Sequence, residues 1–392
     1  MYQGNPDLGA SEFADVLALV TEFVQAEVLP REQEIMADDR VPDTLLVQAA
    51  RLGLFGYAIP QRWGGLGLDL VQDVELAMVL GYTSLAFRSA FGTNNGIAGQ
   101  VLVGFGTSQQ RDDWLPRLAS GEVVASFALT EPGAGSSPDA IRTTATASGD
   151  GWVLEGTKRF ITNAPQAGLF VVFARARREG SSEAPIGVFL VPRSAPGVRV
   201  GPPDATMGQE GSHTAEVSFT SVELGPESLV GADVSVGYRA AMTSLARGRI
   251  HVAALAVGAA RRALDESVAH ASVATQADVL IGQHQLVQAM LADLFVGVMA
   301  GEAMVRAAAI SYATGADRRI APSAAKLFCT EMAGRAADLA VQVHGGTGYM
   351  RGTVVERLYR DVRLMRLYEG TSEIQRLIVG GGLVQAATRA AR

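Results

Sequence analysis

The first third of the chain has the hydrophobic spacing of helices. From Phe13 to about Leu118, apolar residues recur three or four positions apart. One face of a helix repeats every 3.6 residues, so this spacing predicts a mainly helical region. Two stretches with Gly and Asn, at 57–69 and 84–99, interrupt the pattern and are predicted to be loops.

A different pattern begins near Val123. Short runs rich in β-branched residues alternate there with turn residues, which is typical of strands in a compact all-β domain. The predicted strand segments are 123–130, 140–148, 151–162, 169–176, 186–192, 197–201 and 215–224.

Helical spacing returns after about residue 236 and continues to the end, with long Ala-rich stretches at 239–272, 283–314 and 321–343. A chain of 392 residues with 48% hydrophobic content can bury several packed units. We therefore predict a helical N-terminal domain (1–122), a β middle domain (123–235) and a helical C-terminal domain (236–392). No internal repeat or long linker separates them, so we expect them to pack closely.

Composition narrows the partners and the location. Only 19% of residues are charged and the net charge is −7, which argues against a nucleic-acid partner. The first residues lack a basic region followed by an apolar run, and the longest apolar tracts, such as 252–260, are shorter than a membrane span. We expect a soluble, cytoplasmic protein without a membrane span.

Several kinds of chemistry lack their motifs. There is no phosphate-binding P-loop and no G-x-S-x-G nucleophile elbow, and the glycines of 346–352 are spaced wrongly for a dinucleotide fingerprint. The single cysteine, Cys329, lies in an apolar helical pattern and is predicted to be a core residue. No metal site is expected, because the histidines are scattered along the chain as His213, His251, His270, His284 and His344.

Two tracts of the β region contain candidate ligand-binding residues. SFALTEPGAGSS (126–137) leaves a strand and enters a Gly-rich loop, where main-chain amides can approach a planar or anionic ligand. GTKRFITNA (156–164) places Phe160 and Thr162 on one face of a strand, where they suit a flavin. An ordinary hairpin loop and a half-buried strand explain the same residues equally well.

The third tract, MRLYEGTSEIQRLIVG (365–380), contains a candidate base. Ser372 and Gln375 fit a helix capping box, so Glu369 precedes a helix N-terminus in an apolar neighbourhood. Burial raises the pKa of such a carboxyl group and the helix dipole lowers it. An ordinary surface-loop glutamate is the alternative.

Taken together, the tracts strongly resemble the acyl-CoA dehydrogenase family. The resemblance covers nearly the whole chain in order, and its most specific segments are LTEPGAGS, KRFITNA, VQVHGGTGY, RLYRDVR and YEGTSEIQR. It implies an α+β multi-domain fold with a helical N-terminal domain, a middle β-barrel domain and a C-terminal four-helix domain.

The resemblance also implies FAD, held between the middle and C-terminal domains. Gln342, Gly345 and Gly346 match a segment that contacts the FAD of a neighbouring subunit, which implies a homodimer or homotetramer. The other positions that match the family's FAD-binding residues are Phe127, Leu129, Thr130, Gly135, Ser136, Phe160, Thr162, Thr371 and Glu373.

The implied reaction is oxidation of an acyl thioester to its trans-2-enoyl form. Glu369 matches the catalytic base that takes the α-proton, while the β-hydrogen passes to flavin N5 as hydride. The implied substrate is an acyl-CoA or a thioester of an acyl carrier protein, and electron-transfer flavoprotein or another acceptor reoxidises the flavin. The candidate substrate-binding residues are Arg88, Ser136, Arg249, Tyr368 and Gly370.

Three positions in the sequence bear on how FAD and the substrate are bound. Relatives carry an FAD-pyrophosphate Arg where this chain has Ala274, within a segment that ends in Ala277 and Asp278. Ala246 replaces an acidic residue that orders the pantetheine arm, which makes a carrier-protein substrate credible. Arg88 resembles the position with which glutaryl-type enzymes bind a distal carboxylate. An oxidase or desulfinase, and a non-catalytic relative poor in FAD, are the remaining alternatives.

Overall fold

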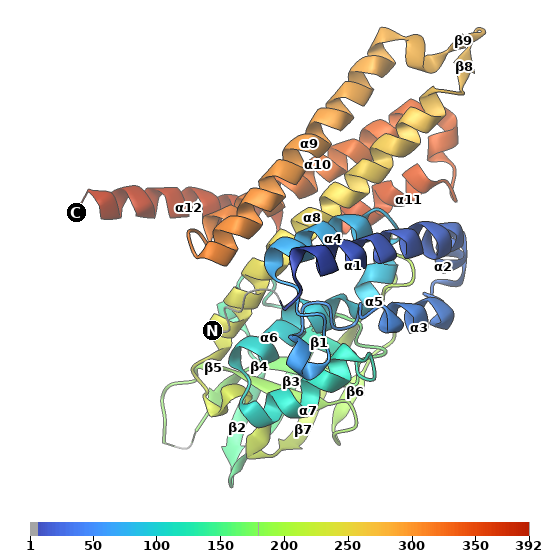
Figure 1. Cartoon of the computed structure of the whole chain (residues 1–392). Helices are drawn as coiled ribbons and strands as arrows, with labels where there is room; N and C mark the ends of the chain where they lie inside the picture. Colours follow the sequence, from blue (N-terminus) through green and yellow to red (C-terminus); the bar gives the residue numbers. More distant parts are fainter. Residues whose placement is uncertain (1–6, 179, 392) are drawn as a thin grey trace.

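The computed structural model describes residues 7–178 and 180–391. The N-terminal part is helical, as predicted, and its helices lie against the long C-terminal helices and the sheet (Figure 1). The helices are α1 (Ala10–Phe23), α2 (Glu32–Asp38), α3 (Asp43–Arg51), α4 (Leu70–Gly81), α5 (Leu85–Asn95), α6 (Ile97–Phe105) and α7 (Ser108–Ala119).

One of the two predicted loops is wrong. Residues 57–69 are irregular apart from one short turn, but 84–99 forms α5 and α6 with a break at Gly96. The Asn94 amide donates to the carbonyl oxygens of Leu118 and Val123, and Asn95 bonds backbone groups of another segment. These buried tertiary hydrogen bonds outweigh the low helix propensity of Gly and Asn.

The middle part is a curled seven-stranded sheet, and each predicted strand segment contains a strand. Strand β4 pairs with β5 along one edge and with β1 and β2 along the other, and the sheet continues through β3, β7 and β6. The strands are β1 (Ala125–Ala128), β2 (Thr144–Ser148), β3 (Gly151–Thr162), β4 (Leu169–Arg177), β5 (Ile186–Pro192), β6 (Val198–Val200) and β7 (Thr214–Leu224).

Strand β4 is buried on both faces, which explains its continuous apolar run. Successive side chains point to opposite faces, so Val171 and Phe173 join the cluster formed with helices α6 and α7, whereas Phe170 and Val172 pack inside the curl. The sheet is thereby fixed against the N-terminal helices.

The C-terminal part is helical and contains the longest elements, as predicted. Helices α8, α9 and α10 run side by side, α12 projects from them, and a two-stranded hairpin joins α8 to α9 (Figure 1). The elements are α8 (Gly237–Ala271), β8 (Thr275–Gln276), β9 (Val279–Leu280), α9 (Gln285–Thr314), α10 (Ile320–His344), α11 (Val354–Asp361) and α12 (Ser372–Ala390). The predicted fold class is confirmed, and the domain boundaries stay predictions.

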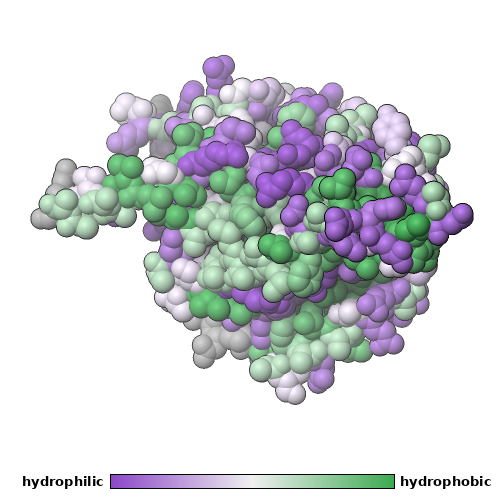
Figure 2. All heavy atoms as spheres, turned by 90° about the horizontal axis from the view of Figure 1, so that it is seen from above, coloured by the Kyte–Doolittle hydropathy of each residue, from purple (hydrophilic) through white to green (hydrophobic). Residues whose placement is uncertain are grey.

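Two further expectations concern the helices of this part. Cys329 is fully buried, as predicted, and burial raises the pKa of its thiol to about 12. Among the described residues, α9 alone is long and apolar enough to cross a membrane, a test that core helices of soluble proteins also pass. Hydrophobic residues also gather along the projecting α12 (Figure 2).

Candidate functional site

A cavity of about 820 Å³ lies where the three parts of the chain meet. Its walls come from α4 and α5, from the β1 and β3 ends of the sheet, from α8, and from the segment that precedes α12. It brings together most of the predicted site residues, namely Arg88, Phe127, Leu129, Thr130, Gly135, Ser136, Phe160, Thr162, Arg249, Tyr368, Glu369 and Gly370.

The backbone at Glu369 has an unusual conformation. Glu369 has φ +53° and Gly370 has φ +93°, both in the left-handed region that non-glycine residues rarely adopt. The two carbonyl groups are held from three sides. Arg249 Nε donates to the Glu369 oxygen at 3.2 Å, Lys326 Nζ donates to the Gly370 oxygen at 2.8 Å, and the Gln375 amide donates to both.

These contacts correct the predicted cap of α12. The N-cap residue is Thr371, whose hydroxyl accepts from the N–H of Ile374, and not Ser372, whose hydroxyl donates to Glu331 at 2.6 Å. Gln375 is fully buried and turns towards the carbonyl groups before the helix instead of closing a capping box. A buried amide needs partners, and the carbonyl groups of the strained turn provide them.

Glu369 lines the cavity, and one of its carboxylate oxygens is buried without a partner in the described part of the chain. Its Oε2 is buried and has no hydrogen-bond partner among the described residues. It rests on Gly248 of α8, where any β-carbon would overlap the carboxylate. Burial raises the pKa of Glu369 to about 7, although the charges of Arg88, Lys326 and Arg249 act in the opposite direction. This carboxyl group is therefore suited to exchange protons near neutral pH.

The loop after β1 forms another wall, and a buried carboxylate shapes it. Glu131 accepts from Lys158 Nζ at 2.7 Å and from the main-chain N–H groups of Arg142 and Thr143. Although burial opposes ionisation, these partners hold the pKa of Glu131 below its usual value. The hydrogen bonds of Glu131 thus fix the loop in place, while Gly135 has open space beside it.

The cavity side of this wall has unused polar groups and one exposed ring. The hydroxyl groups of Thr130, Ser136 and Thr162 line the cavity, and no hydrogen bond joins them to other described side chains. Phe160 is 62% exposed and has φ +57°, because a bulge between Lys158 and Ile161 interrupts the β3–β7 register. An exposed aromatic ring beside free hydroxyl groups fits a planar, polar cofactor such as a flavin.

A buried polar network, which was not predicted from the sequence, lies in the cavity wall around Arg88. Arg88 Nε donates to His251 Nε2 at 2.9 Å, and His251 Nδ1 lies 2.7 Å from Asp73 Oδ1. Arg247 donates to the second Asp73 oxygen at 3.2 Å. The sequence signal that could have indicated this network is the presence of polar residues at inward positions of the apolar helices α4 and α8.

The remaining predicted residues lie outside the cavity lining. Gln342, Gly345 and Gly346 are exposed at and just beyond the end of α10, Thr371 caps α12, and the Glu373 side chain is 77% exposed. The predicted FAD contacts of the first three residues belong to a neighbouring subunit, and they stay predictions.

The segment without the expected Arg forms a tight hairpin. Ala277 and Asp278 occupy its turn with φ +47° and +62°, and Ala274 follows the end of α8. The side chains of this hairpin provide no positive charge that could bind a phosphate. Across residues 7–178 and 180–391, no cluster of three or more His, Cys, Asp or Glu side chains could hold a metal ion.

Comparison with known proteins gives a consistent result along the whole chain. Family models described as acyl-CoA dehydrogenase N-terminal, middle and C-terminal domains match residues 11–122, 126–222 and 236–384. A probable acyl-CoA dehydrogenase of Bacillus subtilis, YngJ, is 36% identical over 376 residues, which cover 94% of this chain and 97% of the relative.

Solved structures agree with this result. A glutaryl-CoA dehydrogenase from Mycobacterium smegmatis superposes with a TM-score of 0.89 and 31% identity, covering 96% of this chain and 95% of its own. An acyl-CoA dehydrogenase complexed with FAD from Bacillus anthracis gives a TM-score of 0.90 and 30% identity, covering 99% of this chain and 69% of its own.

Proposed function

Because the chain belongs to the acyl-CoA dehydrogenase family, we propose that it oxidises the α,β bond of an acyl thioester, with Glu369 as the base. Enzymes of this family are FAD-dependent oxidoreductases that act on CH–CH donors. The Glu369 side chain, which lines the same cavity as Phe160 and Thr162 and has a buried oxygen without a partner among the described residues, carries the proposal.

The proposed reaction begins with proton removal. A thioester α-C–H is weakly acidic, so Glu369 must reach it in the ionised form while the carbonyl oxygen is polarised. No acceptor for the main-chain N–H of Glu369 is found among the described residues, so this group is available to donate to the thioester oxygen. The positive-φ turn held by Lys326 and Gln375 fixes the carboxylate and this N–H relative to each other.

Bound FAD would supply the acceptor for the β-hydrogen, which leaves as hydride with its bonding electron pair and gives the trans-2-enoyl thioester. The residues proposed to hold FAD lie in β1 with the loop that follows it, and near the end of β3. They are Phe127, Leu129, Thr130, Gly135 and Ser136 in the first segment, and Phe160 and Thr162 in the second. These residues and Glu369 line one cavity, so this chain would hold the reacting groups in a fixed orientation, which accelerates a reaction.

The rest of the cavity is proposed to bind the acyl thioester. Arg249, Tyr368 and Gly370 line the same cavity as the base, and so does Arg88, whose charge acts on Glu369. The cavity cations favour a substrate that carries an anionic group at the acyl end. A glutaryl-CoA dehydrogenase is among the similar structures, which supports testing such substrates first.

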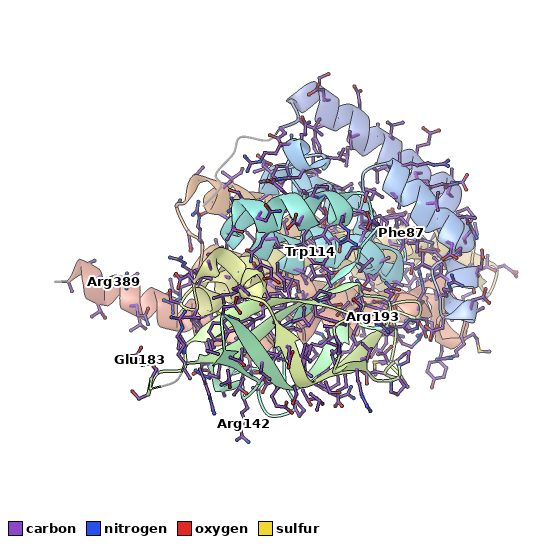
Figure 3. The ribbon with its side chains drawn as sticks, turned by 90° about the horizontal axis from the view of Figure 1, so that it is seen from below. Phe87, Trp114, Arg142, Glu183, Arg193 and Arg389 are labelled. Carbon is purple, nitrogen blue, oxygen red and sulfur yellow. The ribbon has the colours of Figure 1, made fainter. Side chains whose placement is uncertain are left out.

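Flavin reduction by substrate tests the proposal directly. We expect the purified protein with FAD to show a flavin spectrum that an acyl-CoA bleaches without oxygen, and Glu369→Gln to keep the spectrum but lose the bleaching. Glu183→Gln is a matched control, because Glu183 points into open space on the outer loop of the sheet (Figure 3). Bleaching of the Glu369→Gln protein at the wild-type rate would refute the role of the base.

The same assay separates the alternatives. Rapid reoxidation by oxygen would identify an oxidase, whereas reoxidation only by electron-transfer flavoprotein or an artificial acceptor supports a dehydrogenase. Comparing an acyl-CoA with the same acyl group on a carrier protein identifies the thioester carrier. A protein that stays colourless in excess FAD would be a non-catalytic relative.

A further inference from the structure

The two segments proposed to hold the flavin come from strands that do not pair with each other. Strand β1 pairs with β4, whereas β3 pairs with β2 and β7, so β4 and β2 lie between β1 and β3 in the sheet order. The loop after β1 and the end of β3 nevertheless line one cavity. The ladder hydrogen bonds of the sheet therefore do not set the spacing between these two segments, and other contacts must do so.

A buried lysine of β3 makes the connection. Lys158 is fully buried, and its Nζ donates to the Leu129 carbonyl oxygen at 3.0 Å and to Glu131 Oε1 at 2.7 Å. The next residue of β3 adds a main-chain bond, in which the Arg159 N–H donates to the Thr130 oxygen at 2.9 Å. Three successive residues that follow β1 are thus bonded to two successive residues of β3.

The segment that leads into β2 holds Glu131 in turn. Glu131 Oε1 also accepts from the Thr143 N–H at 3.0 Å and from the Thr143 hydroxyl at 2.6 Å, and Oε2 accepts from the Arg142 N–H at 2.6 Å. A buried charge is tolerated only when it is paired and hydrogen-bonded, and the Glu131 carboxylate meets both conditions. The ion pair with Lys158 is therefore fixed in one place.

This ion pair lies directly behind the cavity lining. Lys158 and Glu131 are outside the lining, but their close neighbours Phe160 and Thr130 belong to it. Phe160 lies in the bulge that interrupts the pairing of β3 with β7. Because the sheet does not hold the backbone of the bulge regularly, the bonds of Lys158 and Arg159 determine where this backbone lies relative to the loop.

We propose that the Glu131–Lys158 ion pair sets the spacing between the loop after β1 and the end of β3, and thereby positions the two segments that bind FAD. The inference rests on the proposed FAD-dependent function. Both residues act through the segments that they join. An ion pair that served stability alone could be replaced by neutral side chains of similar size, because a buried pair often contributes little net stability. A pair that sets a spacing cannot be replaced in this way.

The FAD affinity of three variants tests this role. Lys158→Met removes the cation, Glu131→Gln removes the carboxylate, and the double variant Glu131→Gln/Lys158→Met removes both charges. In each variant the FAD dissociation constant of the apoprotein should rise about tenfold or more, because a charge-assisted bond between the two segments is lost. Arg117→Met, which breaks an exposed ion pair with Glu122, is the control and should leave the constant unchanged.

The double variant separates positioning from stability. Lys158→Met leaves a buried carboxylate without its cation, so the unfolding temperature of its apoprotein should fall, and the double variant should recover most of that loss. FAD affinity should not recover with it. At saturating FAD, the visible flavin bands of the double variant should also differ from those of the wild-type protein, because the surroundings of the flavin ring have changed.

Wild-type FAD affinity in the double variant would overturn the inference, and so would a wild-type flavin spectrum in that variant. If Lys158→Met does not fold, Glu131→Gln and the double variant provide the same test, since neither contains the buried carboxylate. Absence of FAD binding by the wild-type protein would refute the proposed function, and this inference with it.

Discussion

At the scale of single residues, the proposed function depends on Glu369. One of its carboxylate oxygens is buried without a partner in the part of the chain that the structure describes, and its main chain is held in a strained turn by Arg249, Lys326 and Gln375. Strain and an unsatisfied buried oxygen both cost stability, and such costs concentrate at functional sites. Contacts that maintain this conformation are therefore as important as the carboxylate.

The pKa of Glu369 predicts the acid side of the pH profile. Burial raises this pKa to about 7, and only the ionised carboxylate can take a proton. As pH falls below about 7, kcat/KM should decrease, approaching tenfold per pH unit. Measuring kcat/KM for one acyl thioester between pH 5.5 and 8.5 tests this, and a flat profile across that range would contradict the role of Glu369 as base.

Gly248 is predicted to be required for the position of that carboxylate. A β-carbon there would overlap the Glu369 side chain, so Gly248→Ala should displace the base. We expect turnover to fall at least about tenfold while FAD content is unchanged, because reacting groups must be aligned closely. Gly104→Ala, a helical glycine with free space around it, is the matched control. Turnover of Gly248→Ala at the wild-type rate would show that the carboxylate can act from another position.

At the scale of elements, the strands and long helices followed from the spacing of apolar residues, because each buries one face or, as in β4, both. The helices in segment 84–99 could not be predicted in this way, since Asn94 and Asn95 make their helix-stabilising hydrogen bonds with distant parts of the chain. The cap of α12 was misplaced by one residue for a related reason: the Ser372 hydroxyl bonds α10.

The α8–α9 hairpin leads to a prediction about FAD. Relatives are expected to hold the FAD pyrophosphate with an Arg where this chain has Ala274, and the hairpin offers no replacement cation. Ala274→Arg should therefore lower the FAD dissociation constant by roughly ten- to a hundredfold. Fluorescence titration of the apoprotein measures this, with Ala274→Gln as an uncharged control. Equal tightening by both variants would show that charge is not the cause.

At the scale of the whole molecule, exposed apolar surface predicts self-association. Along α12, Leu377, Leu383 and Val384 are 58% to 70% exposed, and α9 exposes Phe295 and Val296 (Figure 2). Apolar surface of this extent on long helices favours contact with another copy of the chain. Light scattering should detect at least a dimer, which Leu383→Glu weakens and Arg389→Glu, at the open end of α12 (Figure 3), does not. A monomer at all concentrations would contradict this prediction.

The site could be predicted from the sequence only where its residues lie in local motifs. The segments 126–137, 156–164 and 365–380 are continuous, and most of their candidate residues meet in one cavity. The Asp73–His251 contact joins positions 178 residues apart, and Lys326 reaches Gly370 across 44 residues. The partners in these contacts could not be predicted from the sequence, because both contacts depend on how the helices pack.

The central claim is that Glu369 removes the α-proton, and hydrogen exchange isolates that step from oxidation. An acyl thioester with sulfur in place of the β-carbon retains α-hydrogens but cannot form the enoyl product. In deuterated water, NMR should show that the wild-type protein exchanges these α-hydrogens and that Glu369→Gln does not. Exchange by Glu369→Gln at the wild-type rate would contradict the account.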